Sequence, residues 1–99
     1  MHPGARRDLS HIAAGIAAHV GWSAARRKIE EIAAVIASLG NVPHRGTIRD
    51  DTGLRAVPAG RRGVVVFRVG EPSRTVEVIA VSYGGSDWTK AAGRRNRHP

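Results

Sequence analysis

The sequence contains no cysteine, which excludes disulfide bonds and thiolate-bound metals as sources of stability. It also lacks any run of about 18 apolar residues, the length that a membrane-spanning helix needs. The charged N-terminus has no long apolar segment behind it, so we expect no secretory signal. These absences predict a cytoplasmic protein whose 99 residues form one domain around a single modest core.

Lysine and acidic residues are scarce. Lys28 and Lys90 are the only lysines, so arginine supplies nearly all of the 16 basic side chains, against 8 acidic ones. The surplus of positive charge favours an acidic partner, either nucleic acid or protein, because the arginine fork suits phosphate and carboxylate alike. Codon bias in an alanine-, glycine- and arginine-rich genome explains the arginine excess equally well.

Metal and cofactor sites have no support in the sequence. The histidines show no spacing typical of metal ligands, so we expect no metal site. They are His2, His11, His19, His44 and His98. No Walker-type glycine loop is present either, so we expect no nucleotide cofactor.

Residues 5–20 predict a first helix. Its apolar side chains recur at helical spacing and form one stripe, which consists of Leu9, Ile12, Ala13, Ile16 and Val20. Pro3 suits the first turn, where its missing N–H has no cost, and Gly21 ends the helix.

Residues 23–39 predict a second helix, with Ser23 as its N-cap. Its apolar seam consists of Ala25, Ile29, Ile32, Ile36 and Leu39. Only Gly21 and Trp22 separate the helices, so they form an antiparallel hairpin with Trp22 packed at the turn. A sheet must cover the apolar surface that the hairpin leaves.

The second half predicts that sheet. A short extended segment at 54–57 stops before Pro58, the strongest strand covers 63–69, and another covers 75–83 after a hairpin-length connection. The fold class is therefore α+β, with an N-terminal helical hairpin on a small antiparallel sheet. Residues 1–89 form a single domain. Residues 90–99 are basic, hold no acid or large apolar side chain, and predict a disordered tail.

Five short motifs, in this order and spacing, resemble the RelE/ParE superfamily of toxins. They are the helix entry at 3–9 with Ile12, the stretch at 43–51, Gly53-Leu54-Arg55 followed by Pro58 and Gly60, Phe67-Arg68-Val69, and the last strand at 78–83 with the ending at 84–88. The resemblance implies the toxic half of a bacterial type II toxin–antitoxin pair, neutralised by a cognate antitoxin protein.

One departure from the family concerns the N-terminus. Family members begin with a β-strand before the proline of the helix entry, whereas only Met1 and His2 precede Pro3 here. We therefore expect the first strand to be missing and a sheet edge to be exposed. His2 also replaces the usual serine N-cap.

The resemblance leaves two targets open. RelE-like toxins are ribonucleases that cut messenger RNA on the ribosome, which requires cations for the phosphate and an acid–base pair. In that reading Arg55, Arg61 and Arg68 bind the phosphate and Tyr83 donates a proton or stacks on a base. His44 and Glu77 are weak candidates for the base. A structural reading pairs Arg68 or Arg55 with nearby acids.

ParE-like toxins poison DNA gyrase and need no catalytic set. The ending Gly84-Gly85-Ser86-Asp87 is closer to this branch, which we favour. Partner binding then falls to Arg62, Asp87 and Trp88, with Trp88 either anchoring an antitoxin or closing the end of the sheet. A third reading is an inactive module that binds an antitoxin.

Overall fold

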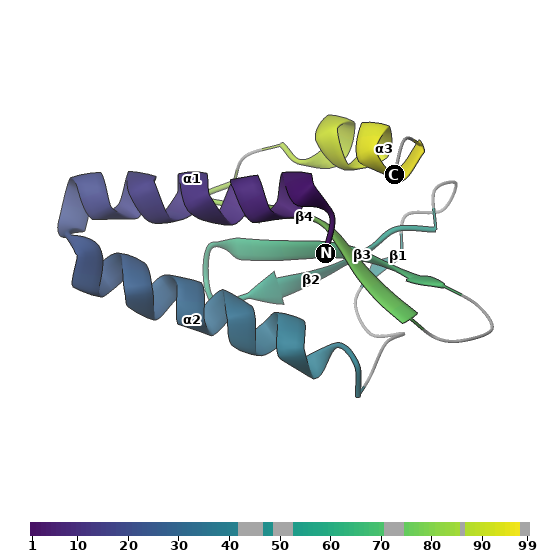
Figure 1. Ribbon diagram of the computed structural model, residues 1–99, viewed down its shortest axis with the longest axis horizontal. Helices are drawn as coiled ribbons and strands as arrows, with labels where there is room; N and C mark the ends of the chain where they lie inside the picture. Colours follow the sequence, from purple (N-terminus) through teal and green to yellow (C-terminus); the bar gives the residue numbers. More distant parts are fainter. Residues whose placement is uncertain (42–46, 49–52, 71–74, 86, 98–99) are drawn as a thin grey trace.

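The computed structural model describes residues 1–41, 47–48, 53–70, 75–85 and 87–97 (Figure 1). Its elements are α1 (Pro3–Val20), α2 (Trp22–Ser38), β1 (Thr47–Ile48), β2 (Arg55–Ala59), β3 (Gly63–Gly70), β4 (Thr75–Tyr83) and α3 (Thr89–Arg97). The strands form one antiparallel sheet in the order β1-β2-β3-β4. The predicted α+β class, the helical hairpin and the antiparallel sheet are confirmed. The motif at 43–51, His44 included, lies outside the described residues except for β1.

The hairpin turns at a single glycine. Gly21 has a φ of 93°, a left-handed conformation that glycine adopts without strain. It ends α1 and is also the N-cap of α2, which has no side-chain cap. The prediction that Ser23 caps the second helix is therefore wrong: Gly21 reverses the chain alone, so Ser23 already lies inside α2.

His2 caps the N-terminus of α1. Its Nδ1 accepts a hydrogen bond of 2.9 Å from the backbone N–H of Gly4, as a serine hydroxyl does in other helices. Pro3 follows as the first helical residue, where no N–H is needed. The imidazole of His2 therefore caps the helix in place of the serine that is usual at this position in the family.

The central strand β3 pairs with both neighbours. Val65 lies opposite Val57 of β2 and Val81 of β4, and a bulge interrupts the β4 register between Val66 and Phe67. β2 continues through Pro58 to Ala59, two residues beyond the predicted segment. Among the described residues, β1 pairs with β2 at Arg55 and Ala56 and not at the proline, so no described residue of β1 requires an N–H at that position.

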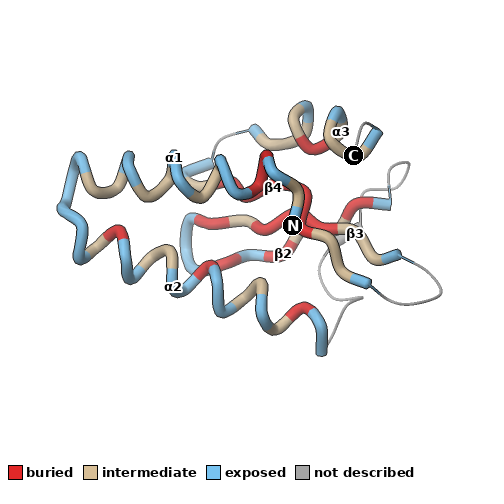
Figure 2. Tube along the Cα trace, in the orientation of Figure 1, coloured by how far each residue is buried: buried red, intermediate tan, exposed pale blue. Residues whose placement is uncertain are grey.

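Alternation along the strands produces two apolar clusters, one on each face of the sheet. Figure 2 shows the buried residues concentrated in the sheet, with further buried positions on the helices. The main core, between the sheet and the hairpin, is centred on Val65 and Phe67, both fully buried. Helix residues Ile32 and Leu39 complete it. The smaller cluster on the other face joins Val66 and Ile79 to buried side chains that include Ala92 of α3. The third helix therefore covers apolar surface that the hairpin cannot reach.

The predicted disordered tail is wrong over the described residues, since Thr89–Arg97 form α3. Ala92 is fully buried, and Arg95 pairs with Asp8 of α1 at 2.8 Å. The pairing is bidentate, with Nη2 bonded to the second carboxylate oxygen at 3.2 Å. One buried methyl group and one ion pair across the fold hold a segment that lacks an apolar stripe of its own.

The outer edge of β4 is partly capped rather than bare. The N–H of His2 donates to the carbonyl of Val78 at 2.9 Å, and the N–H of Val81 donates to the Asp8 carboxylate at 2.9 Å. Between them, Arg95 donates to the carbonyl of Ile79 at 3.0 Å. The expected exposure of a sheet edge is thus reduced, because groups from α1 and α3 occupy backbone positions that a strand would use.

Candidate partner-binding surface

An open groove of about 480 Å³ runs along α1 and ends at the sheet. Its lining residues are His11, Ile12, Gly15, Ile16, His19, Val20, Arg62, Tyr83 and Gly84. The helical members, from His11 to Val20, span about two and a half turns of one face, about 13 Å at 1.5 Å per residue. The groove is therefore long enough to hold a segment of a second chain, with an apolar floor and basic or imidazole groups at its sides.

The β2–β3 turn meets the end of β4 at one wall of this groove. The N–H of Gly84 donates to the carbonyl of Arg62 at 2.9 Å, which fixes the turn against the strand. The Arg62 guanidinium then lies over the Tyr83 ring, 5.8 Å from its centroid, within cation–π range. Arg62 is exposed, and no carboxylate of the described segments forms an ion pair with it. It presents positive charge beside an aromatic face.

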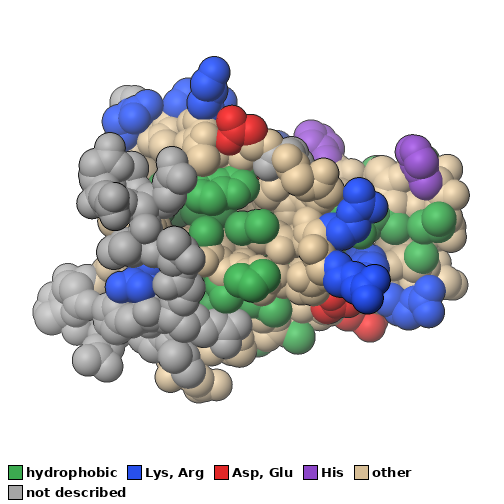
Figure 3. Space-filling view, turned by 180° about the vertical axis from the view of Figure 1, so that it is seen from behind, with side chains coloured by type: hydrophobic (Ala, Val, Ile, Leu, Met, Phe, Trp, Pro, Cys, Tyr) green, Lys and Arg blue, Asp and Glu red, His purple; other side chains and the backbone are tan. Residues whose placement is uncertain are grey.

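The tip of the hairpin carries exposed apolar side chains. Val20 is 68% exposed and Trp22 is 69% exposed, so the prediction that Trp22 packs at the turn is wrong. Trp22 lines a second groove between the helices with Ala13, Ala25 and Ile29. Figure 3 shows histidine and basic side chains around apolar atoms at this end of the molecule. Exposed tryptophan is typical of protein-binding surfaces.

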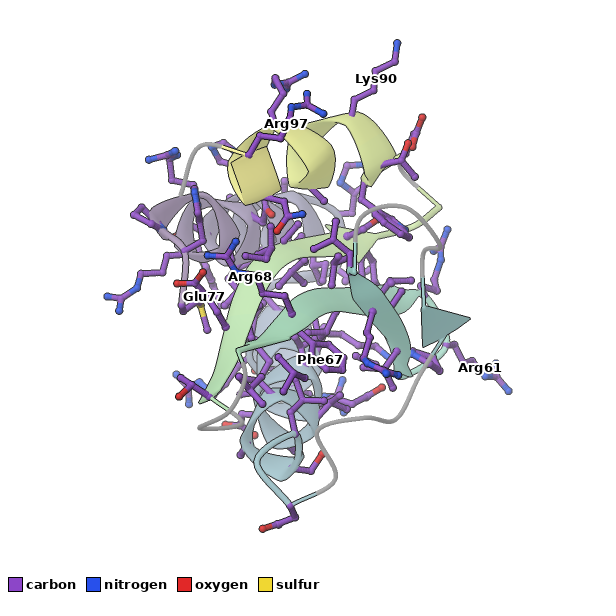
Figure 4. The ribbon with its side chains drawn as sticks, turned by 90° about the vertical axis from the view of Figure 1, so that its right-hand side faces the viewer. Arg61, Phe67, Arg68, Glu77, Lys90 and Arg97 are labelled. Carbon is purple, nitrogen blue, oxygen red and sulfur yellow. The ribbon has the colours of Figure 1, made fainter. Side chains whose placement is uncertain are left out.

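The four candidates for ribonuclease chemistry occupy three places. Arg61 lies in the β2–β3 turn near Tyr83, because Gly63 is the register partner of Tyr83. Arg55 pairs in register with Phe67, and Arg68 with Glu77. Arg68 is thus five residues along β3 from Gly63, about 16 Å at 3.3 Å per residue. The β2–β3 turn places Arg61 at the same end of the sheet as Tyr83, with its side chain extending outward (Figure 4), and Arg55 and Arg68 lie towards the other end.

Arg68 joins the sheet to α3. Its Nη2 donates to Glu77 at 2.6 Å, and its Nη1 donates to the side-chain oxygen of Asn96 at 3.0 Å. Figure 4 shows Arg68 and Glu77 side by side beneath α3. The prediction that Arg68 pairs with a nearby acid is confirmed for Glu77, and the guanidinium is occupied by structural contacts.

Comparison with known proteins agrees with this architecture. Residues 1–88 match the family model of the ParE toxin of the type II toxin–antitoxin system, parDE. The chain belongs to the ParE toxin family. No curated protein matches. Among solved structures, the chromosomal ParDE toxin–antitoxin system from P. aeruginosa superposes with a TM-score of 0.71 at 20% identity, covering 83% of this chain and 89% of that one. The resemblance to the RelE/ParE superfamily is confirmed, and the family that matches is ParE.

Two further residues predicted to bind a partner have structural contacts in this ParE-family chain. The Asp87 carboxylate accepts hydrogen bonds from the backbone N–H of Thr89 at 3.0 Å and from its hydroxyl at 2.6 Å. Asp87 thereby holds the start of α3. Trp88 is half-buried and packs against the smaller core. Of the three predicted partner-binding residues, Arg62 alone lines the groove along α1.

The sequence analysis missed His11, His19 and Gly15 of this ParE-family groove. They recur every four residues, so they share one face of α1, next to the apolar stripe. The signal was present in that spacing. No helix of the described segments is long and apolar enough to span a membrane. Across the same segments, no three His, Asp or Glu side chains are grouped so that they could hold a metal ion.

Proposed function

We propose that this ParE-family toxin inhibits growth by poisoning DNA gyrase and that its cognate antitoxin neutralises it by occupying the groove along α1. The observation that supports the gyrase target is the separation of Arg68 from Tyr83. A metal-free ribonuclease needs its phosphate-binding cations and its acid–base groups around one phosphate. Arg68 instead contacts Glu77 and Asn96, about 16 Å along the strand.

The groove suits an acidic, amphipathic segment of the antitoxin. Ile12 and Ile16 offer an apolar floor, and Arg62 and the histidines line its sides. A helix with apolar residues at spacings of three and four would fill the floor, and its acids would meet the basic rim. A bound segment would also cover the exposed Val20 at the hairpin tip.

A supercoiling assay tests the gyrase proposal. Purified toxin is added to gyrase, relaxed plasmid and ATP, and we expect supercoiling to be inhibited. Stoichiometric antitoxin restores it. The Arg62→Glu variant should need at least tenfold more antitoxin for neutralisation than Arg27→Glu, a matched charge reversal at an exposed position of α2. Unchanged supercoiling at excess toxin contradicts the gyrase target.

One observation favours a RelE-like ribonuclease as the second candidate. The groove along α1 contains two imidazoles, a guanidinium and a phenol, which are residue types that general acid–base chemistry uses. Primer extension on messenger RNA after induction separates the two targets. New RNA ends that disappear in the double variant His11→Ala, Tyr83→Phe would establish the ribonuclease. Induction without growth arrest would leave only the inactive antitoxin-binding module.

A further inference from the structure

We propose that the outer face of α3 is a binding surface for the phosphate backbone of duplex DNA. This site is separate from the groove along α1 and does not depend on the gyrase proposal. Three exposed cations, Lys90, Arg94 and Arg97, occur at positions i, i+4 and i+7 of α3 and therefore share one face of the helix. Figure 4 shows Lys90 and Arg97 on the side of α3 that faces away from the sheet.

No acid of the described segments forms an ion pair with this stripe. The three described acids around α3 are Asp8, Glu77 and Asp87. Asp8 is paired with Arg95, and Glu77 with Arg68. Asp87 is exposed, but its carboxylate holds the first residue of α3. Arg6 and Arg7, exposed in the α1 turn whose Asp8 contacts α3, add two further positive charges to this end of the molecule.

Helix stability explains only part of the stripe. Like charges at positions i and i+4 of a helix repel each other and destabilise it. Cations near a helix C-terminus gain from the helix dipole, which accounts for Arg94 and Arg97 but is unfavourable for Lys90 in the first turn. Gly93 weakens the nine-residue helix further. The cations thus accumulate on one face against their mutual repulsion, as expected for a surface that meets an anionic partner.

The shape of the surface favours duplex nucleic acid. The stripe spans about 10 Å of a helix, at 1.5 Å per residue. Duplex DNA presents one negative charge per about 1.7 Å of its axis, so three cations meet phosphates along a short stretch of groove edge. Single-strand binders add aromatic platforms on which bases stack, whereas α3 contains no aromatic residue. Arg95 and the Arg68–Asn96 contact hold the helix in a fixed position, so its cations are presented together.

The test measures the fluorescence anisotropy of a labelled 20-base-pair duplex titrated with the purified full chain at several salt concentrations. The triple variant Lys90→Gln, Arg94→Gln, Arg97→Gln should bind at least tenfold more weakly. The slope of log K against log [salt] should fall by about 2 to 3, since each phosphate contact contributes about 0.9. Glutamine is a good helix former, so the exposed substitutions keep α3 intact. If the triple variant does not fold, each single variant should lower the slope by about one.

The control removes the same charge elsewhere. Arg26, Arg27 and Arg61 are exposed on α2 and the β2–β3 turn, and α2 lies on the opposite side of the molecule from α3 (Figure 1). Their triple glutamine variant should lose less than threefold in affinity. Equal losses in the two variants would mean that net charge alone drives binding and would overturn the proposal. Tighter binding of single-stranded RNA or of polyglutamate than of the duplex would overturn it as well.

Discussion

The two ends of the molecule use arginine for opposite purposes. At the α3 end, Arg95 and Arg68 are tied to carboxylates and to oxygens of neighbouring segments. At the hairpin end, Arg62 stacks on Tyr83 beside a groove with an apolar floor. The first pair connects α3 to the rest of the fold, and the second position is open to a partner. The same residue type therefore has a structural contact where an acid lies within reach, and at Arg62, where no described acid does, it is the proposed recognition group.

Burial follows the same division. The side chains of Arg95 and Asp8 are only 20% and 21% exposed, so their ion pair is partly shielded from water, which strengthens it. Val20 and Trp22 at the other end are more than two thirds exposed. When the toxin folds alone, these side chains therefore contribute little hydrophobic stabilisation. Substitution of the paired arginines at the α3 end, Arg95 and Arg68, should therefore act on stability, whereas substitutions at the hairpin tip should act on binding.

The largest expected effect is at Arg95. Arg95→Ala should lower the free energy of unfolding by about 2–3 kcal/mol, because it leaves the Asp8 carboxylate without its cation and the Ile79 carbonyl without this donor. Urea denaturation measures the change. Arg94→Ala, at the preceding exposed position, should change stability by less than about 0.5 kcal/mol. Equal effects of the two variants would remove the distinction between structural and surface arginines.

A glycine pair on α1 sharpens the same comparison. Gly4 is buried against the Arg95 guanidinium, so the methyl group of Gly4→Ala would displace that side chain and should cost about 1–2 kcal/mol. Gly15→Ala makes the same chemical change in the same helix with no atom within 4 Å of the new methyl, and should stabilise by about 0.5–1 kcal/mol. Thermal unfolding compares the two. A stabilising Gly4→Ala would show that Arg95 is free to move aside.

The hairpin and the main strands could be predicted from sequence because their signals are local. The stripe from Leu9 to Val20 repeats with the period of a helix, and the run of β-branched valines at 64–66 has the composition typical of a strand. Nothing local predicts α3, which has a single buried residue, Ala92, and contains Gly93. Its anchor is an ion pair between residues 87 positions apart, and a sequence pattern does not reveal which distant charges meet.

The candidate site was predictable in part for a related reason. Arg62 was identified from its place near the sheet, but its neighbourhood depends on the register that sets Gly63 opposite Tyr83. The bulge at Val66/Phe67 shifts the β3–β4 register by one residue. The sequence of the strand contains no residue pattern that predicts the bulge. The ribonuclease interpretation grouped Arg68 with Tyr83 because both belong to the sheet. In the structure, Arg68 lies five residues along β3 from the position opposite Tyr83.

His2 offers a smaller effect at the α3 end. His2→Ala removes the acceptor for the Gly4 N–H and should lower stability by about 0.5–1 kcal/mol, as measured by urea denaturation. His2→Ser provides a different cap and should restore most of the loss. The backbone bond from His2 to Val78 remains in both variants, so the difference between them isolates the cap. A serine variant as unstable as the alanine variant would mean that the ring acts by packing.

The smallest expected effect on stability is at the hairpin tip, where the effect on binding should be large. Trp22→Ser should change the free energy of unfolding by less than about 0.5 kcal/mol, because 69% of the indole is already in water. We expect the affinity for the cognate antitoxin, measured by calorimetry, to fall about tenfold or more, since exposed tryptophans at interfaces are frequent hot spots. Ala34→Ser, at an exposed position further along α2, should leave both quantities unchanged. If Trp22→Ser destabilised the free toxin and left the affinity intact, the hairpin tip would be a structural element like the α3 end, and the division between the two ends would not hold.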